Sequence, residues 1–341
     1  MEKKTINLAV IGCSGMGKAH MIGICAKENA NLYAICDPDE ENLSKRKEEY
    51  CPQIAVADYM QLANDPKVDA AIIAVPDKLH LPITKAFLEA GKHVLCEKPM
   101  ALNLEECEEM MRIEKKSGMR LMIGQVCRCT PAFAMAKELV DSGRIGDLVF
   151  IESEYAHNYG VVPGHNNWRV DPDRHGFIGG GCHPVDLLRW IAGNPTEVYA
   201  HANHKILTDW PVDDTSIAIY KFPNNVMGKI FVSIGCRRDY TMHTVLYGTR
   251  GTIICSNTAD HILLYEDDTE NGKDYTKPQS LPVSINSHNT VAEIDQFVDA
   301  ILEDRDMPCS SMEGAATVAV CYATVQSSKL GKPVEICYPQ V

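Results

Sequence analysis

Long apolar runs are missing from this sequence, and so is an excess of positive charge. No stretch reaches the roughly 18 consecutive apolar residues that mark a candidate transmembrane helix, so we expect no membrane span. The apolar segment that follows the N-terminal lysines covers only residues 6–11, so we expect no secretory signal peptide. The 33 basic and 46 acidic residues give a formal charge of −13, which argues against binding to nucleic acid or to an anionic membrane surface.

A paired cysteine pattern is missing as well. None of the 14 cysteines belongs to a C-x-x-C pair, and they are scattered along a long chain. In the absence of a signal peptide, this usage predicts reduced thiols in a cytoplasmic protein rather than a disulfide framework. Cys127 and Cys129 flank Arg128, but this pattern is too short to define a metal site, and we predict no metal.

Strands and helices are predicted to alternate in the first part of the chain. Continuous apolar runs of this length are typical of parallel strands that are covered on both faces. The clearest helix begins after Asn103, a plausible N-cap with Glu106 three residues later, and ends near Gly118. Such alternation predicts an α/β domain with a doubly wound parallel sheet. The predicted strands are residues 6–11, 31–36, 70–75, 93–96 and 120–123.

The second part of the chain has a different pattern, with few helices between its strands. Consecutive strands separated by turn signals predict an α+β domain with a large, open and mostly antiparallel sheet. We place the boundary near Gly124, which divides the 341 residues into domains 1–124 and 125–341. The predicted strands are residues 148–155, 197–202, 216–222, 226–234, 244–247 and 252–256, and the predicted helices are 131–142, 184–191, 290–302 and 314–329.

A glycine-rich turn follows the first predicted strand. Glycines here let the backbone turn tightly and approach a pyrophosphate, which the N–H groups of the following helix bind. Asp37 follows the second strand, where a carboxylate accepts hydrogen bonds from ribose hydroxyls and repels a 2′-phosphate. We therefore predict NAD rather than NADP as the cofactor. The predicted cradle is Gly12, Cys13, Ser14, Gly15, Met16 and Gly17.

Polar groups also follow three further strands, at the sheet edge where ligands of such folds bind. Lys98 lies just past a strand and precedes a proline, which makes it a candidate cation beside the nicotinamide site. Arg128 is a candidate substrate residue beyond the last of these strands. The predicted cofactor residues at these strand ends are Val75, Pro76, His80, Glu97, Lys98 and Gln125.

These residues resemble the glucose–fructose oxidoreductase, inositol dehydrogenase and MocA family over nearly the whole chain. The most specific signature is Gly91–Pro99, close to the family's GKHVLxEKP, and it is joined by Gly12-x-x-Gly15-x-Gly17-x-x-His20. In the second half of the chain, the segments 168–172 and 180–188 and the C-terminal segment 331–334 also resemble the family. The resemblance implies a Rossmann domain, a second domain with a large open sheet, and a homodimer or homotetramer packed through that sheet.

The resemblance also implies site residues. Lys98 matches the catalytic lysine of the family, and His183 matches a histidine that typically accepts the substrate proton. Many members carry an aspartate four residues before this histidine, whereas this chain has Gly179. The third catalytic group is then missing or comes from elsewhere, and the candidates are Asp186 and the polar segment 155–175. The predicted substrate residues are Lys98, Arg128, Tyr155, His157, Trp168, Arg169, His183 and Asp186. The alternative for Asp186 is a salt bridge, for example with Arg189 or Arg169, and the alternative for Trp168 is a core position.

Together these features predict an NAD-dependent oxidoreductase that acts on a secondary hydroxyl or ketone of a sugar, glycoside or cyclitol. A second possibility is glycoside cleavage by transient oxidation, elimination and re-reduction, in which NAD is recycled. A third is a dinucleotide-sensing protein without turnover.

Overall fold

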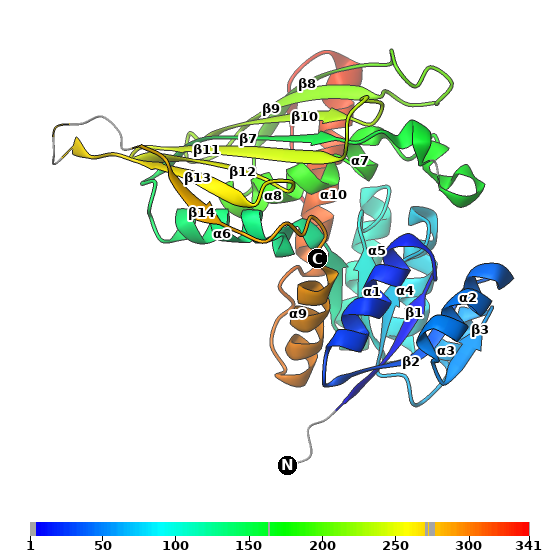
Figure 1. Cartoon of the computed structure of the whole chain (residues 1–341). Coiled ribbons are helices and arrows are strands. Elements are labelled where there is room, and N and C mark those ends of the chain that lie inside the picture. Colours follow the sequence, from blue (N-terminus) through cyan, green and yellow to red (C-terminus); the bar gives the residue numbers. More distant parts are fainter. Residues whose placement is uncertain (1–4, 163, 270–271, 273–276, 341) are drawn as a thin grey trace. The chain divides into compact units, whose positions relative to one another are not determined.

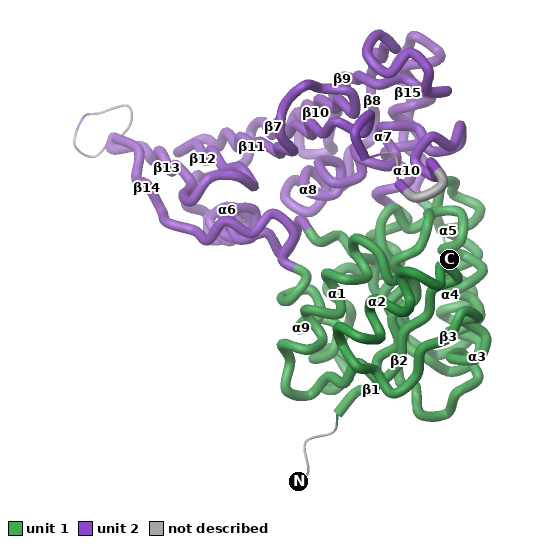
Figure 2. The backbone as a smooth tube through the Cα atoms, turned by 45° about the vertical axis from the view of Figure 1, so that its right-hand side comes forward, with its two compact units in different colours: residues 1–126, 290–315, 339–341 green, residues 127–289, 316–338 purple. Residues whose placement is uncertain are grey.

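The computed structural model describes residues 5–162, 164–269, 272 and 277–340, and this part of the chain forms two compact units. Unit 1 comprises residues 1–126, 290–315 and 339–341, and unit 2 comprises 127–289 and 316–338 (Figure 2). The division near Gly124 predicted from sequence assigns 290–315 to the second domain, whereas the structure places this segment in unit 1.

Unit 1 is built on a parallel sheet whose six strands, among the described residues, have the order β3-β2-β1-β4-β5-β6. This is the doubly wound topology that the sequence predicts. The order reverses beside β1, and ligands of such sheets bind in the crevice outside the carboxyl ends of the strands at that point. The strands are β1 (Ile6–Ile11), β2 (Ala30–Cys36), β3 (Ile54–Val56), β4 (Ala70–Ile73), β5 (His93–Glu97) and β6 (Leu121–Gly124).

The helices of unit 1 begin and end on the expected local signals. At the start of α5 (Leu104–Ser117), the Asn103 side chain accepts a hydrogen bond of 2.9 Å from the backbone N–H of Glu106. The helix ends at Gly118, which has the left-handed φ of 69° that favours glycine. The other helices that cross between strands are α1 (Gly15–Ala26), α2 (Glu40–Tyr50), α3 (Tyr59–Ala63) and α4 (His80–Glu89).

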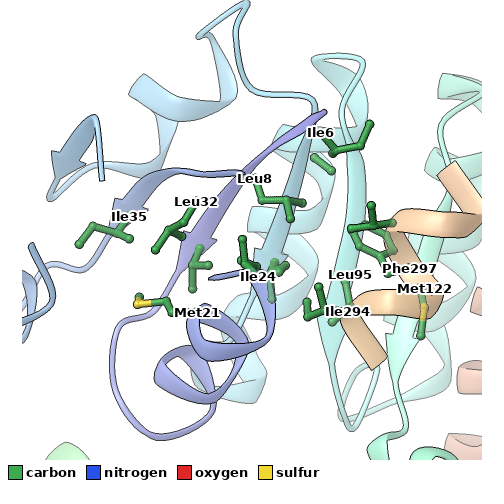
Figure 3. Close-up of a cluster of buried hydrophobic side chains, with 14 of the residues drawn as sticks. Ile6, Leu8, Met21, Ile24, Leu32, Ile35, Leu95, Met122, Ile294 and Phe297 are labelled. Atoms are coloured by element: carbon green, nitrogen blue, oxygen red, sulfur yellow. The ribbon is translucent and has the colours of Figure 1, made fainter. Parts of the chain in front are cut away.

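The helix α9 (Thr290–Leu302) completes the core of unit 1, although it is distant in sequence. Ile294 and Phe297 are fully buried against side chains from α1 and the parallel strands (Figure 3). Gly23 on α1 makes room for this contact, because a Cβ there would lie 3.0 Å from the Ile294 side chain. The apolar face of α9 indicates a buried helix but does not indicate which sheet it covers, which is why the sequence did not assign it to unit 1.

Unit 2 is built on a mostly antiparallel sheet, whose described strands have the order β14-β13-β12-β11-β7-β10-β9-β8-β15. The central pair β7–β10 is parallel, and the other pairs are antiparallel. The strands are β7 (Leu148–Ala156), β8 (Glu197–Asn203), β9 (Thr215–Lys221), β10 (Met227–Ser233), β11 (Thr241–Gly248), β12 (Gly251–Ser256), β13 (His261–Glu266), β14 (Gln279–Pro282) and β15 (Val334–Glu335).

Helices cover one face of the sheet of unit 2 (Figure 1). The contacts come from α6 (Pro131–Asp141), from α8 (Cys182–Ala192), and from the part of α10 (Ser311–Leu330) that belongs to unit 2. On the opposite face, strand residues such as Ile217, Ile219, Met227 and Tyr247 are exposed.

No helix in the described ranges combines the length and apolar character needed to cross a membrane.

Candidate active site

The turn between β1 and α1 in unit 1 has the backbone geometry of a phosphate cradle. A Cβ on Gly12, whose φ is +92°, would lie 2.2 Å from the carbonyl oxygen of Ala74, and one on Gly17 would lie 1.8 Å from that of Gly12. A Cβ on Gly15 would instead meet nothing within 4 Å. Two glycines thus close the turn, and the third leaves open space at the N-terminus of α1, where N–H groups favour an anion.

Asp37 is held beside this turn at the end of β2. Its Oδ2 accepts a hydrogen bond of 2.7 Å from the backbone N–H of Cys13, and its Oδ1 accepts one of 2.9 Å from that of Asp39. A carboxylate has further acceptor positions for ribose hydroxyls. Arg46 donates to the Cys13 carbonyl at 3.1 Å and pairs with Glu49, so its charge is already engaged. The site therefore fits NAD better than a cofactor with a 2′-phosphate.

Two predicted cofactor residues at the neighbouring strand ends have different surroundings. The His80 ring is fully buried, with Nδ1 2.9 Å from the Pro99 carbonyl and Nε2 3.1 Å from that of Val75. Burial opposes its charge, but Cys96, Asp77 and the Pro99 carbonyl outweigh this and raise the pKa of His80 to about 10. His80 thus ties two strand-end loops together rather than facing a ligand. Gln125 is buried, and its Oε1 has no hydrogen-bond partner among the described residues.

Three buried titratable groups of unit 1, His20, Glu97 and Glu293, lie close together beside the signature segment that carries Lys98. His20 Nε2 lies 2.8 Å from Glu97 Oε1, and Glu97 Oε2 accepts a hydrogen bond from the Lys98 backbone N–H at 3.2 Å. Burial opposes ionisation of Glu97, but His20 and Lys98 lower its pKa. Glu293 on α9 joins this cluster. Burial and the charge of Glu97 raise the pKa of Glu293 well above its usual range, while Lys98 opposes this shift.

In unit 2, the imidazole of His183 near the start of α8 lies within a buried cluster of side chains. Its Nδ1 lies 3.3 Å from Cys127 Sγ. The Tyr155 ring stacks on the imidazole, with 5.8 Å between ring centroids and an angle of 20° between the planes. The thiol and the phenol ring come from different elements, so together they fix the orientation of the His183 ring.

Phenol and imidazole groups extend this cluster. Tyr155 Oη lies 3.1 Å from His157 Nδ1 and 2.9 Å from Tyr159 Oη. Burial and the neighbouring phenols raise the pKa of Tyr155 well above its usual range, so the phenol remains a hydrogen-bond donor. Tyr240 Oη lies 3.2 Å from His288 Nε2. The arrangement offers a dense set of phenol and imidazole donors and acceptors, the kind of groups that bind hydroxyl-rich molecules.

Arg128 and Asp186, both predicted to bind substrate, bind each other instead. Arg128 donates from Nε to Asp186 Oδ2 and from Nη2 to Oδ1, each at 2.7 Å, and both side chains are buried. Thr317 Oγ1 adds a hydrogen bond of 3.1 Å to Asp186 Oδ1. The salt-bridge alternative for Asp186 is therefore present, although its two-point partner is Arg128, and Arg189 lies farther away at 4.0 Å. The pair fixes the segment that carries Cys127 against α8.

The space that Gly179 leaves open is filled by Arg174. A Cβ on Gly179 would lie 2.2 Å from Arg174 Nη1, and the guanidinium is buried. Arg174 lies 4.7 Å from the ring centroid of Trp168, which Arg169 also approaches at 4.3 Å. A guanidinium thus occupies the position where the resemblance implies a carboxylate. The Trp168 ring contacts the Arg169 and Arg174 guanidinium groups and is also partly exposed.

Several residues of these clusters were not found from the sequence. Cys127 was noted only as part of a weak C-x-C pattern, and His288 and Tyr240 stand in segments with no motif. Glu293 lies on a predicted helix but carries no local signal of its partners. A buried carboxylate in an apolar helix face is the one sign that could have marked Glu293 as unusual.

The parallel sheet, its glycine turn and Asp37 define an NAD-binding oxidoreductase fold. Residues 6–125 match the family model described as oxidoreductase family, NAD-binding Rossmann fold. Residues 133–254 match the model of the GFO/IDH/MocA C-terminal domain. Together the two matches span more than half of the chain, which therefore belongs to the GFO/IDH/MocA family of NAD-dependent oxidoreductases.

Curated relatives align along almost the whole chain. The uncharacterized oxidoreductase YrbE of Bacillus subtilis is 27% identical, and the alignment covers 98% of this chain and 97% of the relative. Inositol 2-dehydrogenase 2 of Saccharopolyspora erythraea is 28% identical, with 97% and 96% covered.

Among solved structures, levoglucosan dehydrogenase in complex with NADH has a TM-score of 0.90 at 23% identity, with 99% of this chain and 100% of that chain covered. At this identity the likeness shows the shared fold alone.

The Glu293 carboxyl should make stability depend on pH. Because its pKa is raised in the folded state, its contribution is fully present below the unfolded pKa of about 4.3 and is lost as pH rises through the folded value. We expect the melting temperature of Glu293→Gln to fall less than that of the wild type as the pH is raised from acid to alkaline values. The measurement is a set of thermal melts across pH, with the exposed Glu48→Gln as control. If the melting temperatures of Glu293→Gln and the wild type changed equally with pH, the raised pKa of Glu293 would be contradicted.

Removing one member of the Arg128–Asp186 pair should lower the free energy of unfolding more than replacing both members with apolar side chains. Asp186→Asn or Arg128→Met removes one member of this buried ion pair, and we expect either to lower the free energy of unfolding by about 3–5 kcal/mol. The double variant Arg128→Met/Asp186→Leu should lose less than either single variant, because neither charge remains. Urea denaturation measures all three. Losses below about 1 kcal/mol in the single variants would instead indicate a solvent-screened pair.

Proposed function

We propose that this oxidoreductase transfers a hydride between NAD and a carbinol or ketone carbon of a sugar, glycoside or cyclitol. The observation that carries the proposal is the fixed imidazole of His183, held by Cys127 and Tyr155 among phenol and imidazole groups. Curated relatives named inositol 2-dehydrogenase support the same substrate class.

NAD, when bound, supplies the hydride acceptor at its nicotinamide ring. Its cradle is the turn at Gly12–Gly17, Asp37 binds the ribose hydroxyls, and the Gln125 amide oxygen is available to a donor of the cofactor. In the oxidation direction, we assign His183 as the base that takes the hydroxyl proton while the hydride leaves the carbon.

Lys98 is assigned the second catalytic role. We assign to Lys98, whose charge helps to lower the pKa of the neighbouring Glu97, the stabilisation of negative charge that develops on the substrate oxygen. His183 and Lys98 thus divide the work, because one moves a proton and the other supplies a fixed positive charge. Tyr155, His157 and Trp168 are the proposed contacts to the remaining hydroxyls and to the apolar face of the substrate.

We also propose that the chain is a cytoplasmic homo-oligomer without nucleic-acid or membrane partners. The described cysteines are free thiols, as expected in a reducing compartment. The net charge of −13 disfavours polyanionic partners. The uncovered sheet face of unit 2 exposes large apolar side chains, which favours burial against a second copy.

Steady-state NADH formation with a panel of sugars and inositols tests the catalytic assignment. We expect Lys98→Ala and His183→Ala each to lower kcat by roughly 100- to 10,000-fold, because each loses a group that acts in the transition state. NAD binding should persist in His183→Ala, and the exposed His201→Ala serves as the matched control. Unchanged turnover in both variants would exclude the assignment.

The same assay separates the two alternatives. Release of aglycone from a nitrophenyl glycoside with only catalytic NAD, and without NADH accumulation, would indicate redox-assisted glycoside cleavage. Tight NAD binding with no turnover of any polyol or glycoside would indicate a dinucleotide-sensing protein.

The exposed sheet face gives a prediction for assembly. Ile219 and Ile217 lie on this face of β9 and are 55% and 45% exposed. We expect Ile219→Glu to shift the protein from oligomer to monomer in size-exclusion chromatography with light scattering, because a carboxylate is costly to bury. Leu330→Glu, at the exposed end of α10, is the control. An unchanged mass for Ile219→Glu would place the interface elsewhere.

A further inference from the structure

Soft donor atoms gather around His183 in unit 2. Cys127 Sγ, a ring nitrogen of His183 and a ring nitrogen of His288 all lie within 4.8 Å of one another. The two imidazole rings are stacked, with 5.8 Å between centroids and an angle of 30° between the planes. Met242 Sδ lies 3.5 Å from the same thiol. A thiol, two imidazoles and a thioether are the ligand types that select zinc or copper(I) over magnesium or calcium.

The spacing of these atoms is that of ligands to one ion. Bond lengths of about 2.3 Å to sulfur and about 2.0 Å to nitrogen, at tetrahedral angles, place the two ligand atoms roughly 3.5 Å apart. The distance from Cys127 Sγ to His183 Nδ1 is 3.3 Å. A small closing movement of His288, which lies in the loop between β14 and α9, brings in the third ligand.

A supporting layer surrounds the trio, as it does in established metal sites. Tyr240 Oη lies 3.2 Å from His288 Nε2 and also forms a hydrogen bond with Cys127. The Arg128–Asp186 pair fixes the residue that follows Cys127.

We propose that Cys127, His183 and His288 form a Zn²⁺ site whose occupation switches off His183 as a base. Binding replaces the thiol proton, which is released to solvent as the thiolate–zinc bond forms. The metal takes the lone pair of one His183 nitrogen, and the other nitrogen keeps its proton at neutral pH, so the ring no longer accepts one from substrate. The inhibition rests on the proposed function, whereas the binding does not.

The binding is tested with Co²⁺ as a spectroscopic substitute for zinc. We expect chelator-treated protein to gain a thiolate-to-cobalt charge-transfer absorption in the near ultraviolet at one equivalent, and Zn²⁺ to remove it. Cys127→Ser and His288→Ala should each weaken binding by at least about 100-fold, and Tyr240→Phe by about tenfold. The neighbouring Cys129→Ser is the matched control and should bind normally. Absence of the absorption in the wild type, or its persistence in Cys127→Ser, would overturn the site.

The switch is tested by activity in the same variants. We expect Zn²⁺ to inhibit wild-type NADH formation, a chelator to restore it, and Zn²⁺ at the same concentration to leave the rate of His288→Ala unchanged relative to its own metal-free rate. Activation by Zn²⁺, or binding without inhibition, would overturn the switch. A cobalt spectrum in a protein that turns over no polyol would sustain the site and refute the proposed function.

Discussion

The two-point contact between Arg128 and Asp186 is the constraint on which the site in unit 2 depends. Two hydrogen bonds of 2.7 Å between buried charges leave little freedom in the relative placement of the segments that carry them. Cys127 precedes Arg128, and His183 lies one helical turn before Asp186, so the same contact brings the thiol to the imidazole. A pair that the sequence suggested for substrate binding is instead what holds the proposed base in place.

Local patterns predicted much of the fold. The strands β1 and β5, the helix α5 with its Asn103 and Gly118 ends, and the glycine turn lie where apolar runs, caps and glycines indicate them. These features depend on neighbours in the sequence. The position of α9 does not, because its buried face fits any apolar surface, and only the three-dimensional contact of Ile294 and Phe297 with unit 1 decides it.

The candidate site likewise combines features that the local sequence predicts with contacts between residues that are distant in sequence. Asp37 follows a strand next to the glycine turn, where the spacing indicates it, and the structure adds that its carboxylate accepts a hydrogen bond from the Cys13 N–H of that turn. The hydrogen-bond partner of His183, Cys127, lies 56 positions away in the sequence, and no spacing rule connects the two. The filling of the Gly179 space by Arg174 is likewise visible only in the structure, since a glycine in sequence does not show which side chain takes its place. Lys98 and His183 remain assignments from the resemblance, to which the structure adds their surroundings.

The central claim is direct hydride transfer between a polyol carbon and NAD. It is tested by incubating the enzyme with NAD and an inositol or sugar that carries deuterium at the reacting carbinol carbon, and by analysing the reduced cofactor by mass spectrometry. The account predicts NADH that contains one deuterium from the substrate. Reduced cofactor without deuterium, or turnover in which no deuterium ever reaches the cofactor, would contradict it.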